Sequence, residues 1–190
     1  FRGDWFEFPD PVLAEGLLGS GGHAGGPGLG TLLIVKAPAP DDAAETLVLA
    51  ALAAHASAHP TTTRVAILEP RLDRGVAGAF PSPLIAPAGM DDLVALCASA
   101  GRVVSMRLHG AVAGILAGVP VLAGPAAKAR ALLRDMGCAA GGFTDAAALR
   151  AALEAPPPAA ATEAARDRIR QLCEDGLSQI ARALKAAGVP

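Results

Sequence analysis

The sequence predicts an α/β fold in which a Rossmann-like parallel sheet has helices on both of its faces. Short apolar segments that contain β-branched residues alternate with longer segments of helical periodicity, which is the pattern of consecutive strand–helix–strand units. Glycine, proline or aspartate separates the segments, as at turns and helix ends. No internal repeat divides the pattern, so we expect one domain of this class.

The apolar segments and the turn signals give an expected order of elements. Phe8–Leu13 is interpreted as a strand that ends in a turn, and residues 71–82 as a loop with scattered charge. Asp41-Asp42 is a candidate N-cap for the first long helix, and Gly137 a candidate helix C-terminus. Strands are expected at 31–36, 64–68, 83–86, from 103 onward and at 119–123, and helices at 42–58, 91–99, 110–118, 129–136, 146–154 and 162–187.

The chain has 190 residues, which suits one domain with an added segment. We expect residues 1–30 to be a linker and the remnant of a preceding domain, and residues 31–190 to be the Rossmann-like domain. Gly19–Gly30 is rich in glycine, but it precedes a strand, and no Gly-Lys-Ser or Gly-Lys-Thr follows it. A phosphate-binding loop needs glycines after a strand and at the start of a helix, so a flexible linker is favoured.

Composition argues against several classes of protein. The net charge is −2 and tyrosine is absent, so neither a basic stripe nor stacking platforms for nucleic acid are expected. The three cysteines lie far apart, which favours reduced thiols in a cytoplasmic protein. His55 and His59 have helical metal-ligand spacing but no third ligand nearby, so we expect surface histidines and no metal. The apolar window 110–127 is too short for a membrane span, which leaves at most a peripheral membrane association.

The most informative stretch runs from Val103 to Pro120. It opens as a buried strand and continues as a helix of small residues. Strand alternation would place Ser105, Arg107 and His109 on one side. Parallel sheets bind ligands at the carboxyl ends of their strands, so this cation and imidazole suggest a site for a small anion. A structural network in which Arg107 pairs with a carboxylate is the alternative.

This stretch also carries a family resemblance. Ser105–Gly110, then Gly118–Pro120 and Lys128, resembles the most recognisable string of the polysaccharide pyruvyl transferase family. The expected helix at 91–99 is similar to the segment before that string, and Phe8–Leu13 to an element between the two halves of such proteins. The resemblance covers most of the chain and is most specific over residues 105–128.

The resemblance implies a fold, a reaction and partners. Members are similar to GT-B glycosyltransferases, so this chain would be the carboxyl-terminal domain and would face a missing amino-terminal domain. The family transfers the pyruvyl group of phosphoenolpyruvate to a sugar of a cell-wall or surface polysaccharide, or of a lipid-linked precursor, and forms a pyruvate ketal. Phosphoenolpyruvate would be the donor substrate, and no cofactor is expected.

The resemblance also assigns roles at the site. His109 would be the general acid that protonates the methylene carbon of phosphoenolpyruvate, a step that suits an imidazole. Arg107 would hold the phosphate or carboxylate in paired charge-assisted bonds. The amides of Leu108 and Gly110 at the helix start could donate to the phosphate.

Three further residues complete the predicted site. Lys128 matches a family lysine and would neutralise substrate charge, although a solvated lysine at a helix start is an equal alternative. Lys36 would stand in for a family arginine after the first strand. Ser105 is placed beside the substrate, as a packing residue rather than a nucleophile. Residues 124–127 lack the Tyr-Asp pair that the family usually has there.

Two other functions remain open at this point. A GT-B-type glycosyltransferase or nucleotide-sugar epimerase domain would use the same cleft for a nucleotide sugar, and would need an acidic residue for the ribose. A non-catalytic interaction domain would show a large exposed apolar face and no ligand binding at Arg107 and His109.

Overall fold

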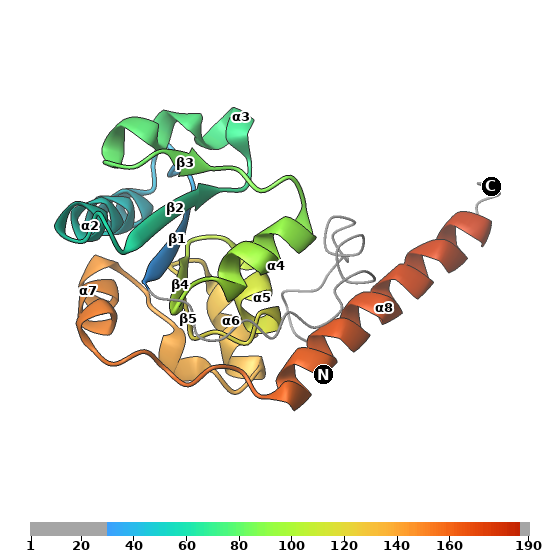
Figure 1. The fold of residues 1–190 in the computed structure, drawn as a ribbon. Coiled ribbons are helices and arrows are strands. Elements are labelled where there is room, and N and C mark those ends of the chain that lie inside the picture. Colours follow the sequence, from blue (N-terminus) through green and yellow to red (C-terminus); the bar gives the residue numbers. More distant parts are fainter. Residues whose placement is uncertain (1–29, 187–190) are drawn as a thin grey trace.

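A five-stranded, all-parallel sheet forms the centre of the protein, as the computed structural model of residues 30–186 shows (Figure 1). The strand order is β3-β2-β1-β4-β5, so the α/β class and the Rossmann-like sheet are confirmed. The predicted strand at residues 8–13 and the linker at 1–30 lie outside the described residues, apart from residue 30. The strands are β1 (Thr31–Val35), β2 (Thr63–Ile67), β3 (Leu84–Ile85), β4 (Arg102–Ser105) and β5 (Val121–Ala123).

The central strand β1 shows why the strand segments of the sequence are apolar at every position rather than at every second one. Its five residues are all buried, and its side chains alternate between two cores. Leu32 and Ile34 belong to one core, whereas Leu33 and Val35 belong to the other. A strand covered on both faces needs apolar residues at every position.

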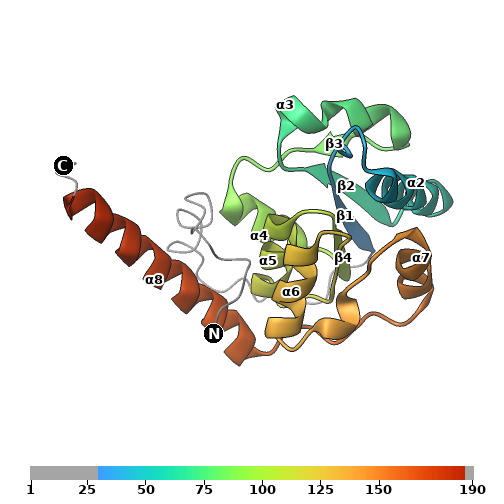
Figure 2. The same ribbon diagram turned by 180° about the vertical axis from the view of Figure 1, so that it is seen from behind.

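Helices cover both faces of the sheet, as predicted. α2 (Ala43–Ala58) and α7 (Ala146–Glu154) contact each other on the face of Leu33 and Val35 (Figures 1 and 2). The other face is packed against four helices. These are α4 (Met90–Ala98), α5 (Leu108–Leu116), α6 (Ala127–Asp135) and α8 (Glu163–Ala186).

The predicted turn chemistry fixes several helix ends. The carboxylate of Asp42 accepts a hydrogen bond of 2.9 Å from the amide of Glu45, so it caps α2 as expected. Asp145 accepts from two amides at the start of α7. Gly137 follows α6 with a φ of +74°, a left-handed conformation that glycine adopts without a steric penalty.

The prediction of a loop at residues 71–82 is wrong. A short helix α3 (Pro70–Asp73) and a 3₁₀ helix η1 (Arg74–Ala79) occupy most of this segment. A further 3₁₀ turn, η2 (Ala139–Gly141), follows α6. α3 is only one turn long, and so has no apolar periodicity to detect. Pro70 at its first turn is the local signal, because proline is favoured at the start of a helix.

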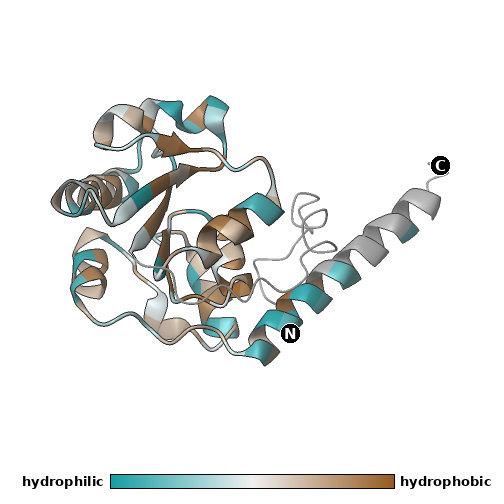
Figure 3. Cartoon of the chain, viewed as in Figure 1, coloured by the Kyte–Doolittle hydropathy of each residue, from teal (hydrophilic) through white to brown (hydrophobic). Residues whose placement is uncertain are grey.

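Hydropathy follows this layering. The strands and the inner sides of the surrounding helices are apolar, whereas α3 and the first turns of α8 are largely hydrophilic (Figure 3). α8 starts beside α5 and extends beyond the sheet (Figures 1 and 2). Within residues 30–186, no helix combines the length and the apolar character that a membrane crossing requires.

Candidate active site

The strand order creates a topological switch point between β1 and β4. From β1 the chain continues to β2 and β3 on one side, while β4 is followed by β5 on the other. In parallel α/β sheets, ligands bind in the crevice at the carboxyl ends of such a strand pair. Lys36 follows β1 and Arg107 lies two residues after β4, so the structure brings these two predicted residues to the switch point.

The link between β4 and α5 is held by Ser105. β4 ends at Ser105 and α5 starts at Leu108, with Arg107 extended between them at φ −115° and ψ 142°. The buried Ser105 hydroxyl donates to the carbonyl of Arg107 at 2.7 Å and accepts from its amide at 3.1 Å. The expected strand alternation stops before His109, because His109 is the second residue of α5. Ser105 therefore shapes the turn that presents Arg107.

Arg107 is paired with two carboxylates. Its Nη2 donates to both carboxylate oxygens of Asp73 at 2.7 Å, and its Nη1 donates to Glu69 Oε1. Asp73 is 1% exposed and also accepts from the amides of Ala37, at 2.9 Å, and of Glu69, at 3.3 Å. The structural network that the sequence left open is thus present around Arg107 in this structure.

Lys36 is paired in a similar way. Its Nζ contacts Glu45 Oε1, and the buried Glu45 side chain also accepts from the amide of Ala39 at 3.3 Å. Each of the two cations at the switch point therefore has a buried carboxylate beside it. A buried carboxylate is stable there only because a cation and backbone amides compensate its charge.

A pocket of about 300 Å³ opens beside this network and includes His109. Glu69 lies in its wall and connects it to Arg107. The apolar and glycine part of the lining comes from the end of β2, the loop before α4, and α4 itself: Leu68, Pro87, Ala88, Gly89, Met90 and Leu93. The structure thus places an imidazole and a carboxylate at one opening, and this carboxylate pairs with the guanidinium of Arg107.

The remaining predicted residues lie at the same edge of the sheet. Leu108 and Gly110 belong to the first turn of α5, and Gly110 is buried. Lys128 is exposed in the first turn of α6, after β5. Because β4 lies between β1 and β5, Lys36 and Lys128 are on opposite sides of Arg107. Contact with substrate stays a prediction for each of these residues.

Gly110 has a packing role that the sequence did not indicate. A Cβ added there would lie 2.3 Å from the Ser105 hydroxyl and 2.8 Å from Ile34 Cδ1. We expect Gly110→Ala to lower the free energy of unfolding by about 1–3 kcal/mol, because a crowded core must shift to accept the methyl group. Denaturant unfolding followed by circular dichroism measures this change. Gly78→Ala, where nothing lies within 4 Å of the added Cβ, is the matched control.

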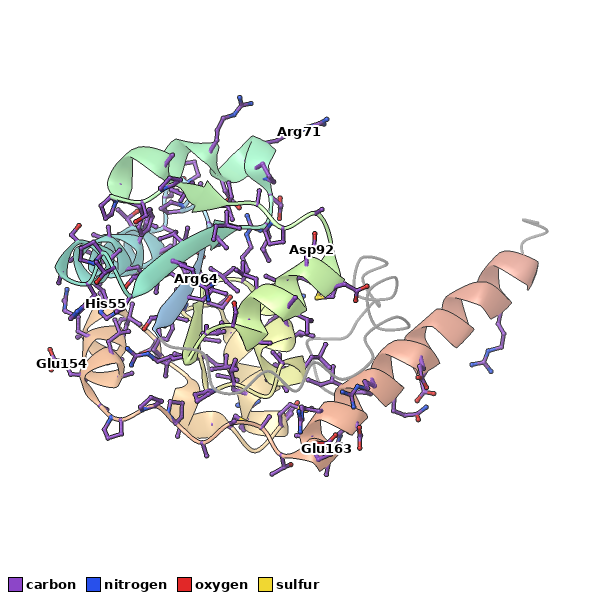
Figure 4. All side chains as sticks on the ribbon, in the orientation of Figure 1. His55, Arg64, Arg71, Asp92, Glu154 and Glu163 are labelled. Atoms are coloured by element: carbon purple, nitrogen blue, oxygen red, sulfur yellow. The ribbon has the colours of Figure 1, made fainter. Side chains whose placement is uncertain are left out.

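The histidine pair on α2 differs in part from its prediction. The rings of His55 and His59 lie 4.7 Å apart, and His55 is at the end of α2 (Figure 4). Partial burial, with the charges of His59 and Arg102, lowers the pKa of His55. His59 is exposed as expected, whereas His55 is half-buried. No group of three metal-binding side chains occurs among the residues that the structure describes.

Sequence reasoning missed the acidic residues of the site. Glu69 and Asp73 lie in the segment between β2 and β3, and Glu45 in the first turn of α2. A local signal existed for Glu69, which lies two residues after the buried strand β2 at the binding edge of a parallel sheet. Asp73 contacts a residue 34 positions away, and no local pattern encodes that pairing.

The fold and this site define a Rossmann-like α/β domain with an arginine and a histidine after the strand at its switch point. Residues 72–123 match the family model described as polysaccharide pyruvyl transferase, which confirms over this segment the resemblance found in the sequence. The matched segment contains Asp73, Arg107 and His109, and indicates polysaccharide pyruvyl transferase activity in general terms. No curated protein matches the chain.

Proposed function

We propose that this chain is the donor-binding half of an enzyme that transfers the pyruvyl group of phosphoenolpyruvate to a sugar of a cell-wall or surface polysaccharide. The observation that carries the proposal is that His109 lines a pocket beside Glu69, and that Glu69 pairs with Arg107, which follows β4 at the switch point. The family match over residues 72–123 supports the same reaction class. The sugar would be part of a polysaccharide or of a lipid-linked precursor.

Ketal formation needs an acid and an anion clamp. His109 would protonate the methylene carbon of phosphoenolpyruvate, which leaves a cationic carbon that carries the phosphate and the carboxylate. One sugar hydroxyl attacks this carbon and loses its proton; the carbon–oxygen bond to phosphate then breaks, and a second hydroxyl closes the ketal. Of the two hydroxyl protons, one restores the acid and the other leaves with inorganic phosphate. Arg107 would hold the donor through its carboxylate or phosphate.

The described residues supply parts of only one wall of such a site. In a GT-B arrangement a second domain would face the pocket and carry much of the acceptor site. We therefore propose that the 190-residue chain alone transfers little or no pyruvyl group, and that turnover requires an amino-terminal domain. The same proposal places the reaction in the cytoplasm, where a lipid-linked acceptor would bring the enzyme to the membrane surface.

The class of donor is tested by comparing the binding of phosphoenolpyruvate with the binding of UDP-sugars. Isothermal titration of the complete protein that carries this chain is expected to give saturable binding of phosphoenolpyruvate and none of UDP-glucose. Binding of UDP-glucose alone would favour the glycosyltransferase or epimerase alternative. Binding of neither ligand would favour an interaction domain.

A further inference from the structure

The two carboxylates that pair with Arg107 are held very differently. Asp73 is 1% exposed and accepts from two backbone amides besides the guanidinium. The Glu69 side chain is 47% exposed. Among the described residues, its carboxylate accepts a hydrogen bond from Arg107 Nη1 and from no other group. Glu69 is also the N-cap residue of α3, but its side chain does not cap the helix. Asp73 is thus fixed by the fold, whereas Arg107 holds the Glu69 side chain in the part of the chain that the structure describes.

The backbone of Glu69 is anchored even though its side chain is not. Its amide donates to Asp73 Oδ2 at 3.3 Å, so the side chain can rotate while α3 keeps its place. Rotation would release Arg107 Nη1 from Glu69, which lines the pocket together with His109. Loss of an exposed ion pair costs little free energy, whereas loss of the buried pair with Asp73 would be expensive.

An anionic donor cannot approach Arg107 without competing with Glu69. A carboxylate or phosphate beside the Glu69 carboxylate would be repelled, and one of the two N–H groups of Nη1 is already directed at Glu69. If the donor instead replaces Glu69, Arg107 keeps an anionic partner and the net charge around it changes little. Arg107 Nε is buried without a hydrogen-bond partner among residues 30–186.

We propose that Glu69 is an exchangeable counter-ion: it neutralises Arg107 before the donor binds and gives up Nη1 to an acidic group of phosphoenolpyruvate. Asp73 is the positioning residue that keeps the guanidinium in place during the exchange. This inference rests on the proposed function, since it takes phosphoenolpyruvate as the donor. It adds a residue outside the matched segment to the site, and it makes donor affinity depend on a competing carboxylate within the protein.

The test is isothermal titration of phosphoenolpyruvate into the complete protein and its Glu69→Gln variant. Glutamine keeps the size of the side chain and removes its charge. We expect the Kd to fall about fivefold, the upper range for an exposed ion pair, with a midpoint of thermal unfolding lowered by about 2–4 °C, because the free protein loses the same ion pair. Glu154→Gln is the matched control, because Glu154 is exposed at the end of α7, away from α3 (Figure 4). It should leave the Kd unchanged.

A second variant distinguishes the role of Asp73 from the role of Glu69. Asp73→Asn should raise the Kd, because the guanidinium loses its fixed charged partner, so the two variants should shift the Kd in opposite directions. A Glu69→Gln protein that binds phosphoenolpyruvate with the wild-type Kd, or more weakly, would overturn the exchange while leaving the proposed function intact. If neither the wild type nor Glu69→Gln binds phosphoenolpyruvate, the proposed function itself fails, and the exchange fails with it.

Discussion

Replacement of Arg107 by alanine is expected to abolish measurable binding of phosphoenolpyruvate. Loss of a charged hydrogen-bonding partner from a largely desolvated site raises a Kd by about a hundredfold or more, and the Arg107 side chain is 17% exposed. Isothermal titration of the complete protein measures this change. Arg71→Ala is the matched control, because Arg71 is an exposed arginine on α3 that points away from the sheet (Figure 4).

The same substitution also affects the fold, and the experiment must separate the two effects. Without Arg107 the buried carboxylate of Asp73 keeps two amide donors but no cation, which lowers the free energy of unfolding by on the order of 3 kcal/mol. The Arg107→Gln, Asp73→Asn double variant removes both charges together and keeps hydrogen-bonding groups at both positions. We expect this protein to be more stable than Arg107→Ala and still unable to bind phosphoenolpyruvate. Wild-type affinity in the double variant would exclude Arg107 as the anion clamp.

The parts of the fold that were predictable from sequence are those with local signals. β1 could be recognised because a strand buried on both faces is apolar throughout. α2 could be placed because Asp42 precedes a long helical pattern and caps it. α3 has neither length nor periodicity, and its bounds become clear only from Pro70 and from the contacts of Asp73.

The sequence predicted the cation of the candidate site but not the carboxylates that pair with it. The position of Arg107 follows from its place after β4 in a parallel sheet, whereas the carboxylates that neutralise it come from a separate segment. Pairing of Arg107 with Asp73 depends on the distance between α3 and the end of β4, which the strand order sets. A sequence pattern shows that a cation reaches the binding edge, but it does not show how much of its charge remains available to a ligand.

This difference changes how the cations of the site should be interpreted. Arg107 and Lys36 each contact a buried carboxylate, so the switch point is closer to neutral than the sequence alone implies. Attraction of phosphoenolpyruvate would then depend less on net positive charge and more on directed hydrogen bonds. Lys128, which is exposed after β5, is the candidate for additional positive charge at this edge of the sheet.

His109→Ala is expected to lower kcat by about a hundredfold to ten-thousandfold, the range for loss of a general acid. Binding of phosphoenolpyruvate should change little, because in the proposed site the arginine rather than the imidazole holds the anion. His109 lines the pocket together with Glu69, the residue that pairs with Arg107. Release of inorganic phosphate, measured with the complete protein and an acceptor sugar, reports kcat.

The pH dependence of kcat distinguishes an acid from a structural histidine. A general acid works in its protonated form, so wild-type kcat should fall as the pH rises, and His109→Gln should lose this dependence along with the rate. A structural role would instead lower kcat by one factor at every pH and leave the shape of the profile unchanged. His59→Ala, at the exposed end of α2, should keep both the wild-type rate and its profile. Wild-type turnover by His109→Ala would show that the proton reaches the methylene carbon from another group.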